Sequence, residues 1–357
     1  MDERLTVFTP YGVEAASARV RIFEWLERLG APYGLQTYIG ARDASPKTLA
    51  RHVPSVAAAE RRLRALSRNL NNTTVVLHRE ASPLSRGGIE EQLLRGAGLS
   101  VYDFDDALQW DVHGGRHREF AQKPTKAVRC VRAADIVIAG SELLADWAAA
   151  HSREVLLVPT CVNPSAYRAK TDFELNDPPI VGWVGSPTTE PHLELISGPL
   201  LEIHRRTGAR LRLVSRGNRE LGKLNTMTER VDWHPDTLTS VMSSFDLAVA
   251  PLAQDLFARG KCAYKILQYA ASAIPTVASQ TGANRRVSGS LGLLTALSED
   301  DWVAQLLGLI EAPSMTRAEI GRTARLRVVE CYSFDAWLPT IRTALRLDPA
   351  SGEVASS

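Results

Sequence analysis

The chain has 357 residues, of which 45% are apolar and 23% charged, a composition typical of soluble globular proteins with room for two domains. Its 42 lysines and arginines nearly balance its 40 aspartates and glutamates, so overall charge gives no indication of nucleic-acid binding. The four cysteines form no Cys-x-x-Cys pair, which favours free thiols over a disulfide framework or a zinc site. No run of about 18 apolar residues occurs, and the start MDERLTVF lacks a signal-peptide core. We therefore expect a cytoplasmic protein without a transmembrane segment.

Short β-branched segments alternate with longer amphipathic segments along the chain, a pattern that predicts parallel strands joined by helices. The strands expected in the first half are residues 5–9, 73–78, 100–104, 135–140 and 154–159. Helices are expected at residues 16–30 and 141–152. A second series of strands begins near residue 180, at residues 179–187, 209–217, 231–234, 245–252 and 273–279. The restart predicts two similar α/β domains.

The polar, proline-containing segment 163–180 has the composition of a linker between these domains. We expect a first domain at residues 1–165, a second at 178–330, and a closing helix with a frayed tail at 331–357. The closing helix is expected to return towards the first domain. In a doubly wound sheet, ligands bind at the carboxyl ends of the strands, so the two domains predict an interdomain ligand cleft.

The segment RGKCAYKILQYAA, residues 259–271, predicts a helix beginning just after Gly260 with two lysines near its start. Cations at a helix N-terminus oppose the helix dipole and are normally disfavoured there. Lys261 and Lys265, four positions apart on one face, therefore predict a binding site for a diphosphate, together with the backbone N–H groups of the helix start. The alternative is that both lysines belong to a solvated face.

A second loop of the same kind follows the strand IVGWV, where Gly185 allows close backbone approach to a ligand. Ser186 and Thr188 offer hydroxyls to a phosphate, or cap the helix that follows. Arg216, at the end of the next strand, is a further candidate cation, although an ordinary surface arginine explains it equally well. The loop is neither a Walker A motif nor G-x-G-x-x-G, which disfavours ATPase and classical dehydrogenase functions.

These long collinear segments resemble the retaining glycosyltransferase family 4, whose members have the GT-B fold of two Rossmann-like doubly wound domains. The resemblance rests on IVGWVGSPTT and on FDLAVAPL to IPTVAS in the second half, and on VVLHREASPL, VYDFDDALQWD and AADIVIAGSELLADWA in the first. It implies a nucleoside-diphosphate sugar as co-substrate, a donor-binding second domain and an acceptor-binding first domain. The family also places a glycine-rich loop near Gly12, which would let the backbone approach the donor phosphates.

The chain departs from the family pattern at two glutamates spaced eight positions apart. Their places are taken by Gly260 and Gln268. The resemblance implies that Gln268 hydrogen-bonds a ribose hydroxyl of the donor. The role of the first glutamate near the donor sugar cannot be carried over, so the identity of the sugar stays open.

The first half carries the candidate catalytic groups. DFDD at residues 103–106 is superficially similar to a metal-binding D-x-D motif, but the cationic loops already neutralise a diphosphate, so we expect no metal site. The resemblance places Asp105 at a strand end facing the scissile bond, where Asp105 and Asp106 orient an acceptor hydroxyl or stabilise an oxocarbenium ion. His78, at the end of another strand, is a third candidate for a sugar hydroxyl, and a structural histidine is an equal alternative.

The resulting hypothesis is a retaining, metal-independent glycosyltransferase without a cofactor, which moves a hexosyl residue onto a small-molecule or glycan acceptor. A sugar-nucleotide epimerase or phosphorylase on the same fold, and an inactive nucleotide-sugar-binding protein, are the alternatives. The basic amphipathic segment 57–70 leaves peripheral membrane contact open, with a surface helix as the favoured interpretation.

Overall fold

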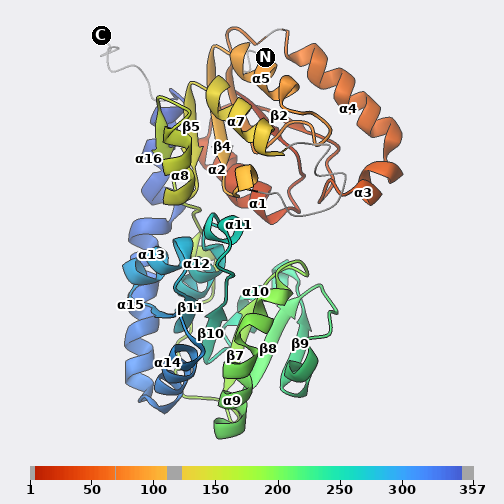
Figure 1. Cartoon of the computed structure of the whole chain (residues 1–357). Coiled ribbons are helices and arrows are strands. Elements are labelled where there is room, and N and C mark those ends of the chain that lie inside the picture. The colour runs from red at the N-terminus through yellow and green to blue at the C-terminus, as the bar shows by residue number, and fades with distance from the viewer. Residues whose placement is uncertain (1–4, 69, 111–122, 348–357) are drawn as a thin grey trace, which may run out of the picture. The chain divides into compact units, whose positions relative to one another are not determined.

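The computed structural model describes residues 5–68, 70–110 and 123–347 (Figure 1). The chain divides into two compact units. The first consists of Met1–Thr160, Gly260–Cys262 and Trp337–Ser357, and the second of Cys161–Arg259 and Ala263–Ala336. The expected linker therefore belongs to the second unit, and three residues from the middle of the second half belong to the first. From residue 348 onwards, the expected tail lies outside the described residues.

The first unit is built on a parallel six-stranded sheet with the order β2-β1-β3-β4-β5-β6. Its strands are β1 Leu5–Thr9, β2 Gly34–Thr37, β3 Thr74–His78, β4 Leu99–Phe104, β5 Ile136–Ala139 and β6 Val155–Leu157. The central strands are apolar almost throughout because helices cover both faces of such a sheet. The five strands expected in this half are confirmed, whereas the edge strand β2, with the sequence GLQT, was not predicted.

The helices of the first unit connect these strands. They are α1 Ala16–Ala18, a π-helical turn at Arg19–Phe23, α2 Glu24–Leu29, α3 Pro46–Arg51, α4 Val53–Leu66, α5 Gly88–Arg95, α7 Lys123–Ala133 and α8 Glu142–Ala149. The helix expected at residues 16–30 is thus interrupted by the π-turn and ends at Gly30, whose φ of 64° is the left-handed geometry that closes a helix. The last helix, α16 Phe334–Ala344, enters the first unit at Trp337, where Arg342 Nη1 donates to the Leu29 carbonyl at 2.9 Å.

The second unit contains another parallel six-stranded sheet, with the order β12-β11-β10-β7-β8-β9. Its strands are β7 Ile180–Val184, β8 Arg210–Ser215, β9 Thr228–Asp232, β10 Leu247–Ala250, β11 Thr276–Ser279 and β12 Leu294–Ala296. Four of the expected strands are confirmed. The fifth, expected at residues 231–234, begins and ends earlier as β9, and the edge strand β12 was not predicted.

Two apolar clusters cover the two faces of this second sheet. Val184 and Ala248 point into one cluster, whereas Trp183 and Val249 point into the other, as the period-two alternation of a strand requires. The helices that pack around the sheet are α9 Ser197–Thr207, α10 Pro235–Met242, α11 Leu256–Arg259, α12 Tyr264–Ala271, α13 Gly282–Leu291, α14 Glu299–Glu311 and α15 Ser314–Tyr332. The fold is therefore the expected pair of Rossmann-like α/β units.

The strand orders identify one position in each sheet where the direction of winding reverses. In the first sheet, β2 lies on one side of β1, and β3 to β6 follow on the other side, so the reversal lies between β1 and β3. In the second sheet, the same reversal lies between β7 and β10. Ligands of doubly wound sheets bind outside the carboxyl ends of the strands at such switch points. The loops after β1, β3, β7 and β10 are therefore the first places to look for a site.

Candidate active site

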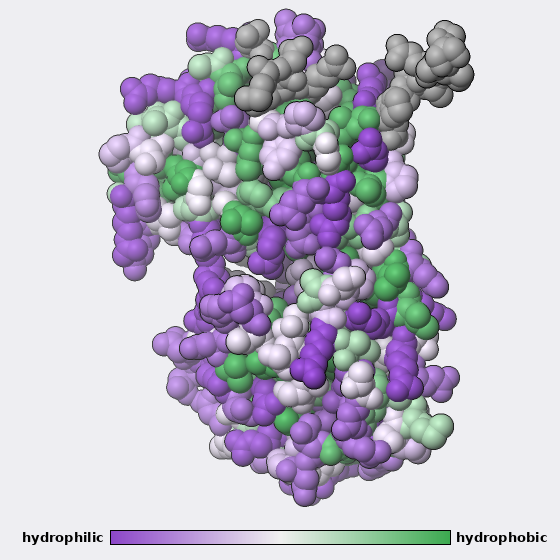
Figure 2. Space-filling model, turned by 180° about the vertical axis from the view of Figure 1, so that it is seen from behind, coloured by the Kyte–Doolittle hydropathy of each residue, from purple (hydrophilic) through white to green (hydrophobic). Residues whose placement is uncertain are grey.

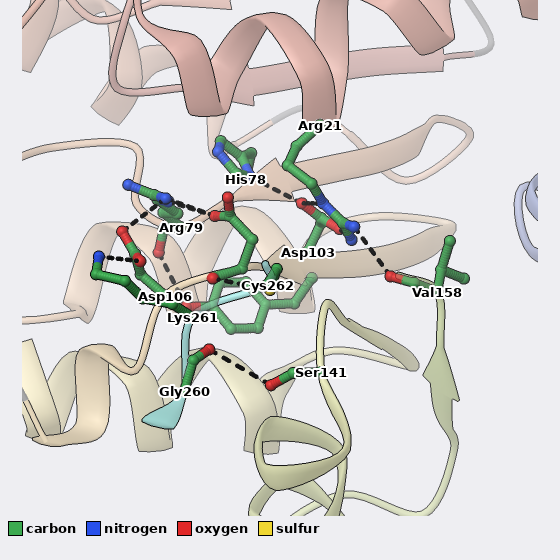
Figure 3. A network of polar contacts seen from close by, with 12 residues as sticks. Arg21, His78, Arg79, Asp103, Asp106, Ser141, Val158, Gly260, Lys261 and Cys262 are labelled. Atoms are coloured by element: carbon green, nitrogen blue, oxygen red, sulfur yellow. Dashed lines mark hydrogen bonds and ion pairs between the residues drawn. The ribbon is translucent and has the colours of Figure 1, made fainter. Parts of the chain in front are cut away.

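A buried ionic cluster occupies the carboxyl ends of β3 and β4 in the first unit (Figure 3). His78 Nδ1 lies 2.7 Å from Asp103 Oδ2, and the two residues stand opposite each other in the strand register. Arg21 reaches the same carboxylate and donates from Nη1 to the Val158 carbonyl at 2.9 Å. Figure 3 shows Asp103 held between Arg21 and His78. All four residues are in the first unit, so this cluster is part of its core.

The next two carboxylates of the DFDD segment are held by one arginine. Arg79 lies 2.6 Å from Asp105 Oδ1 and 2.7 Å from Asp106 Oδ2, and its side chain is 13% exposed. Its backbone has a left-handed φ of 59°, a conformation that L-residues seldom adopt. The Arg79 N–H donates to the Asp103 carbonyl at 2.8 Å, and Tyr102 donates from its hydroxyl to the Arg79 carbonyl at 3.0 Å. The fold therefore fixes this guanidinium against both carboxylates.

A segment distant in sequence completes the cluster. Lys261 Nζ lies 3.3 Å from Asp106 Oδ1, and Cys262 donates from Sγ to the Asp105 carbonyl at 3.1 Å. Gly260 accepts a hydrogen bond from Ser141 Oγ at 3.4 Å, and a Cβ on Gly260 would collide with Ala107. These contacts explain why residues 260–262 belong to the first unit.

This arrangement corrects the expectation that Lys261 and Lys265 share one face of a helix. Helix α12 begins at Tyr264, after Ala263 takes a left-handed φ of 57°. Lys261 therefore precedes the helix, and its ammonium group is paired with Asp106. The two lysines stand in different surroundings and need separate explanations.

The surrounding charges determine which groups are ionised. Burial raises the pKa of the Asp106 carboxyl, but Arg79 and Lys261 outweigh that effect and lower it to about 2. Burial likewise opposes ionisation of Asp103, and Arg21 and His78 lower its pKa to about 2. The pKa of the nearby Tyr11 phenol is raised by burial and by the charge of Glu80. At neutral pH the cluster therefore presents carboxylates and a protonated tyrosine.

The three candidate catalytic residues differ in which of their side-chain polar atoms are already engaged in hydrogen bonds or ion pairs. Both carboxylate oxygens of Asp106 are engaged, Oδ1 by Lys261 and Oδ2 by Arg79. The contacts of Asp105 with the described residues fall on Oδ1, which leaves Oδ2 for a hydroxyl. His78 is fully buried, and its Nε2 has no hydrogen-bond partner among the described residues. Asp105 is therefore the best placed of the three to contact a substrate.

Gly12 serves the packing of its own unit. A Cβ at this position would collide with the Gly40 carbonyl oxygen, and the Gly12 N–H donates to the Ala41 carbonyl at 2.9 Å. The absence of a side chain is thus explained without a phosphate, and this N–H is already bonded. The expected contact of Gly12 with a donor loses its physical basis.

In the second unit, Lys265 of α12 contacts a side chain of β7, one of the two strands at the switch point. Its ammonium group lies 5.5 Å from the ring centroid of Trp183, a distance typical of a cation–π contact. Trp183 belongs to β7, and Lys265 lies in the first turn of α12, after β10. Gly185 is needed here because a Cβ would collide with the Trp183 ring. The lysine is therefore fixed at the carboxyl end of β7.

The loop after β7 is closed by its own hydroxyls. Ser186 Oγ lies 2.9 Å from Thr188 Oγ1, and Thr189 Oγ1 donates to the Ser186 carbonyl at 3.0 Å. The Ser186 N–H donates to Thr189 Oγ1 at 3.2 Å. Ser186 and Thr188 are nevertheless exposed. Their hydroxyls can therefore exchange these mutual bonds for bonds to a ligand.

Arg216 lies at the carboxyl end of β8, where its guanidinium covers the ring of Trp233 at 4.7 Å and donates to the Trp233 carbonyl at 3.2 Å. The adjacent loop is braced by Glu190, which is fully buried, lies 3.3 Å from Arg230 and fills the space beside Gly217. The loops after β7 and β8 are thus joined through Glu190.

Gln268, expected to bind a ribose, lies within α12 and is 6% exposed. Its Nε2 donates to the Tyr167 hydroxyl at 3.0 Å. The amide nitrogen is therefore engaged within the second unit.

Sequence reasoning did not identify Arg79 or the role of Arg21. Arg79 lies within VVLHREASPL, but the resemblance assigned it no role. Arg21 lies between Val20 and Ile22 in a turn where all three are buried. The left-handed backbone conformation of Arg79 also could not be predicted from the sequence. In the described ranges, no group of three or more His, Cys, Asp or Glu side chains is arranged to hold a metal ion. Each DFDD carboxylate is instead paired with a cationic side chain.

Comparison with known proteins identifies relatives of this fold. Residues 178–312 match the sequence profile of a family described as Glycosyl transferases group 1, which confirms the resemblance for the second unit. Among curated proteins, none matches the chain by sequence.

Solved structures similar to the whole chain share its fold at low identity. Sucrose-phosphate synthase from Thermosynechococcus elongatus is 15% identical with a TM-score of 0.69, covering 97% of this chain and 98% of that one. Anabaena HepE, solved with UDP and glucose, is 13% identical with a TM-score of 0.68, covering 96% and 99%. A UDP-forming trehalose-phosphate synthase from Burkholderia xenovorans is 11% identical with a TM-score of 0.63, covering 96% and 99%. These similarities confirm the GT-B fold.

Within the described parts of the chain, no helix has both the length and the apolar character needed to cross a bilayer.

Proposed function

We propose that this chain, whose residues 178–312 belong to the Glycosyl transferases group 1 family, is a retaining glycosyltransferase. It moves a hexosyl residue from a nucleoside-diphosphate sugar to an acceptor hydroxyl. The observation that carries this proposal is the family match, because it spans the loops after β7, β8 and β10 and the start of α12. Those loops contain the cationic and hydroxyl groups that a diphosphate requires. The retaining outcome rests on the resemblance of the sequence to the retaining glycosyltransferase family 4.

The donor diphosphate binds, in this proposal, to groups of the second unit. Lys265 and Arg216 supply positive charge, each held against an aromatic ring that restricts its motion. Ser186 and Thr188 supply hydroxyl donors. Charge-assisted hydrogen bonds to phosphate are stronger than neutral ones, so the two cations contribute most of the affinity. They also stabilise the charge that develops on the departing diphosphate. Lys261 is not included among these groups because its ammonium group is paired with Asp106.

The acceptor hydroxyl is bound, in this proposal, by Asp105 of the first unit. Its Oδ2 accepts the hydroxyl proton in a hydrogen bond, which orients the oxygen and increases its nucleophilicity. Arg79 holds the carboxylate through Oδ1 and so fixes its direction. Asp106 then acts as the second carboxylate that keeps Arg79 and Lys261 in place.

The transfer does not require a metal ion, because Lys265 and Arg216 neutralise the diphosphate. We expect donor turnover in excess EDTA to equal turnover in added magnesium. Complete loss in EDTA, restored by manganese or magnesium, would contradict this assignment.

The donor site is tested by calorimetric binding of UDP, GDP and ADP to the wild-type chain and to the Lys265→Ala and Arg216→Ala variants. We expect one nucleotide to bind best and each variant to bind it at least tenfold more weakly. The matched control is Arg206→Ala, an exposed arginine of α9 paired with Glu202. Equal affinities in all four proteins would refute the donor site.

A further inference from the structure

A large groove lies on the first unit, formed by α4, the loop before α5, the start of α5 and Arg129 of α7. Its volume is about 940 Å³, which is at the upper end of the range for ligand sites of proteins. None of the proposed catalytic residues lines it. Its size is suited to several sugar units.

The charged side chains that line the groove are predominantly cationic, and they stand among polar and apolar residues such as Leu84 and Ile89. Arg64, Arg68, Arg86 and Arg129 line it, and Glu60 is the acidic residue on its wall. Four positive charges and one negative charge leave a formal charge of +3, although the whole chain carries only +2. Figure 2 shows hydrophilic side chains gathered along the edge of the first unit that carries α4. A concave surface lined by one sign of charge concentrates oppositely charged ligands.

The one carboxylate on the wall is engaged within the protein and offsets one of the four arginines. Glu60 Oε1 accepts hydrogen bonds from the hydroxyls of Tyr38, at 3.0 Å, and Ser82, and its Oε2 lies 3.5 Å from Arg64. Arg129 is 3.6 Å from Glu91, whereas Arg68 contacts no carboxylate among the described residues. Arg68 therefore keeps its charge available for an anion in the groove.

The loop that forms one wall is held in a single conformation. The buried Glu90 accepts hydrogen bonds from the N–H groups of Ala81 and Ser82, at 3.2 and 2.9 Å, and from Ser85 Oγ at 2.6 Å. Gly87 has a φ of 98°, and helix α5 after it begins without a side-chain cap. The uncapped N-terminus contributes a partial positive charge to the same wall, which the first-turn carboxylates Glu90 and Glu91 partly offset. The backbone of this wall is therefore held in place before any ligand binds.

The same loop leads directly from the candidate active site. It begins at Arg79, the residue that holds Asp105, and continues through Glu80 to Ser82. Lys126 ties these residues together, at 2.6 Å from Glu80 and 2.8 Å from the Ser82 carbonyl. The backbone of the groove wall is thus continuous with the residue that positions Asp105.

We propose that the groove binds the anionic units of a polyanionic glycan whose end is the acceptor. This inference rests on the proposed function and names its acceptor class. Guanidinium groups bind carboxylate and phosphate groups in bidentate fashion, so a glycan that carries such groups fits the four arginines. Binding energy from these distant units would hold the acceptor end at Asp105.

The test uses a fluorescently labelled hexamer of galacturonate, with maltohexaose as its neutral counterpart, and fluorescence anisotropy on the full chain. We expect the anionic hexamer alone to bind, and to bind more weakly as salt rises. Arg68→Ala and Arg86→Ala should each weaken binding about five- to tenfold, and the double variant at least 30-fold. Arg61→Ala, an exposed arginine of α4 outside the groove, is the matched control and should bind like the wild type. Arg68→Lys keeps the charge and should recover part of the affinity.

Equal binding by the groove variants and the wild type would overturn the proposal, as would equal binding of the neutral hexamer. Arginine-dependent sedimentation with phosphatidylglycerol vesicles, without hexamer binding, would also overturn it in favour of a membrane surface. Nucleoside diphosphate affinity and donor turnover of the groove variants distinguish failure of the glycan groove from failure of the proposed transferase function. Normal donor turnover without hexamer binding refutes the groove alone, whereas arginine-dependent hexamer binding without donor turnover refutes the proposed transferase and leaves the groove as a glycan site.

Discussion

Arg79 is the residue on which the carboxylate cluster of the first unit depends most. In an Arg79→Ala variant, Asp105 loses the guanidinium at 2.6 Å and Asp106 the one at 2.7 Å, while Lys261 stays 3.3 Å from Asp106. Removing one partner of a buried ion pair costs about 3 to 5 kcal/mol, because the remaining charge is left buried. Since Lys261 still compensates Asp106, we expect a loss near the lower end, about 3 kcal/mol in the free energy of unfolding of the first unit.

The backbone gives this prediction an internal control. Alanine at position 79 keeps the strained φ of 59°, whereas glycine adopts it freely. Both variants lose the guanidinium, so Arg79→Gly should be more stable than Arg79→Ala by about 1 kcal/mol. We expect stability to decrease from the wild type to Arg79→Gly and then to Arg79→Ala. The difference between the two variants reports the backbone strain, whereas both lack the charge.

Hydrogen exchange measured by mass spectrometry resolves the two units, which a single unfolding curve does not. A loss of about 3 kcal/mol corresponds to roughly a 100-fold fall in protection for peptides from β3 and β4. Peptides from the second unit should keep their protection and serve as an internal reference. Arg95→Ala, which removes an exposed pair with Glu91, should leave both units unchanged. Protection of β3 and β4 within threefold of wild type in Arg79→Ala would refute the reasoning.

Three further predictions follow from the same geometry. Asp105→Asn should lower acceptor-dependent turnover at least tenfold and leave calorimetric affinity for the nucleoside diphosphate within twofold, because Asp105 is assigned to the acceptor; an equal loss of both would contradict that role. Lys265→Ala should reduce kcat/KM for the donor roughly ten- to a hundredfold in steady-state assays, and unchanged kinetics would remove Lys265 from the donor site. Because the pKa values of Asp103 and Asp106 are lowered to about 2, their contribution to stability should be complete above about pH 4 and lost as the pH falls towards 2. Acid unfolding followed by circular dichroism would test this, and a first unit as stable at pH 2 as at pH 5 would contradict it.

The central strands of both sheets were predictable from sequence, whereas two of the four edge strands, β2 and β12, were missed. A strand buried on both faces of a parallel sheet must be apolar over its whole length, as LTVFT and IVGWV are. The edge strands β2 and β12 are short and partly exposed, so their sequences lack that signal. Complete burial is not required for prediction, because the edge strand β6 is only half-buried and its apolar sequence VLL was still recognised.

The start of α12 shows a different limit. The lysines, glycine and apolar residues around position 260 are compatible with a helix from Lys261 onwards, and local propensity favours it. The structure instead places Ala263 in the left-handed region and packs Cys262 beneath Asp105. The boundary is set by tertiary contacts between residues 157 positions apart, so the local sequence could not predict where the helix begins.

The candidate site was predictable in part for the same reason. Asp105 and Arg216 were expected at strand ends, and each directly follows a strand, β4 and β8. Lys265 was expected near a helix start and lies in the first turn of α12. Their partners depend on register and on side-chain reach, as when His78 stands opposite Asp103 and Arg21 reaches across 82 positions. Such pairings arise only when the sheet forms.

The measurement that tests the central claim most directly is the release of nucleoside diphosphate from a panel of nucleoside-diphosphate sugars, with and without added acceptors, followed by nuclear magnetic resonance of the product. The account predicts release that depends on both a donor and an acceptor, and a glycosidic bond with the anomeric configuration of the donor. Conversion of a nucleoside-diphosphate sugar without any acceptor would identify an epimerase or hydrolase, and a product of inverted configuration would contradict the retaining mechanism. Nucleotide binding without turnover of any donor would contradict the assignment as an enzyme.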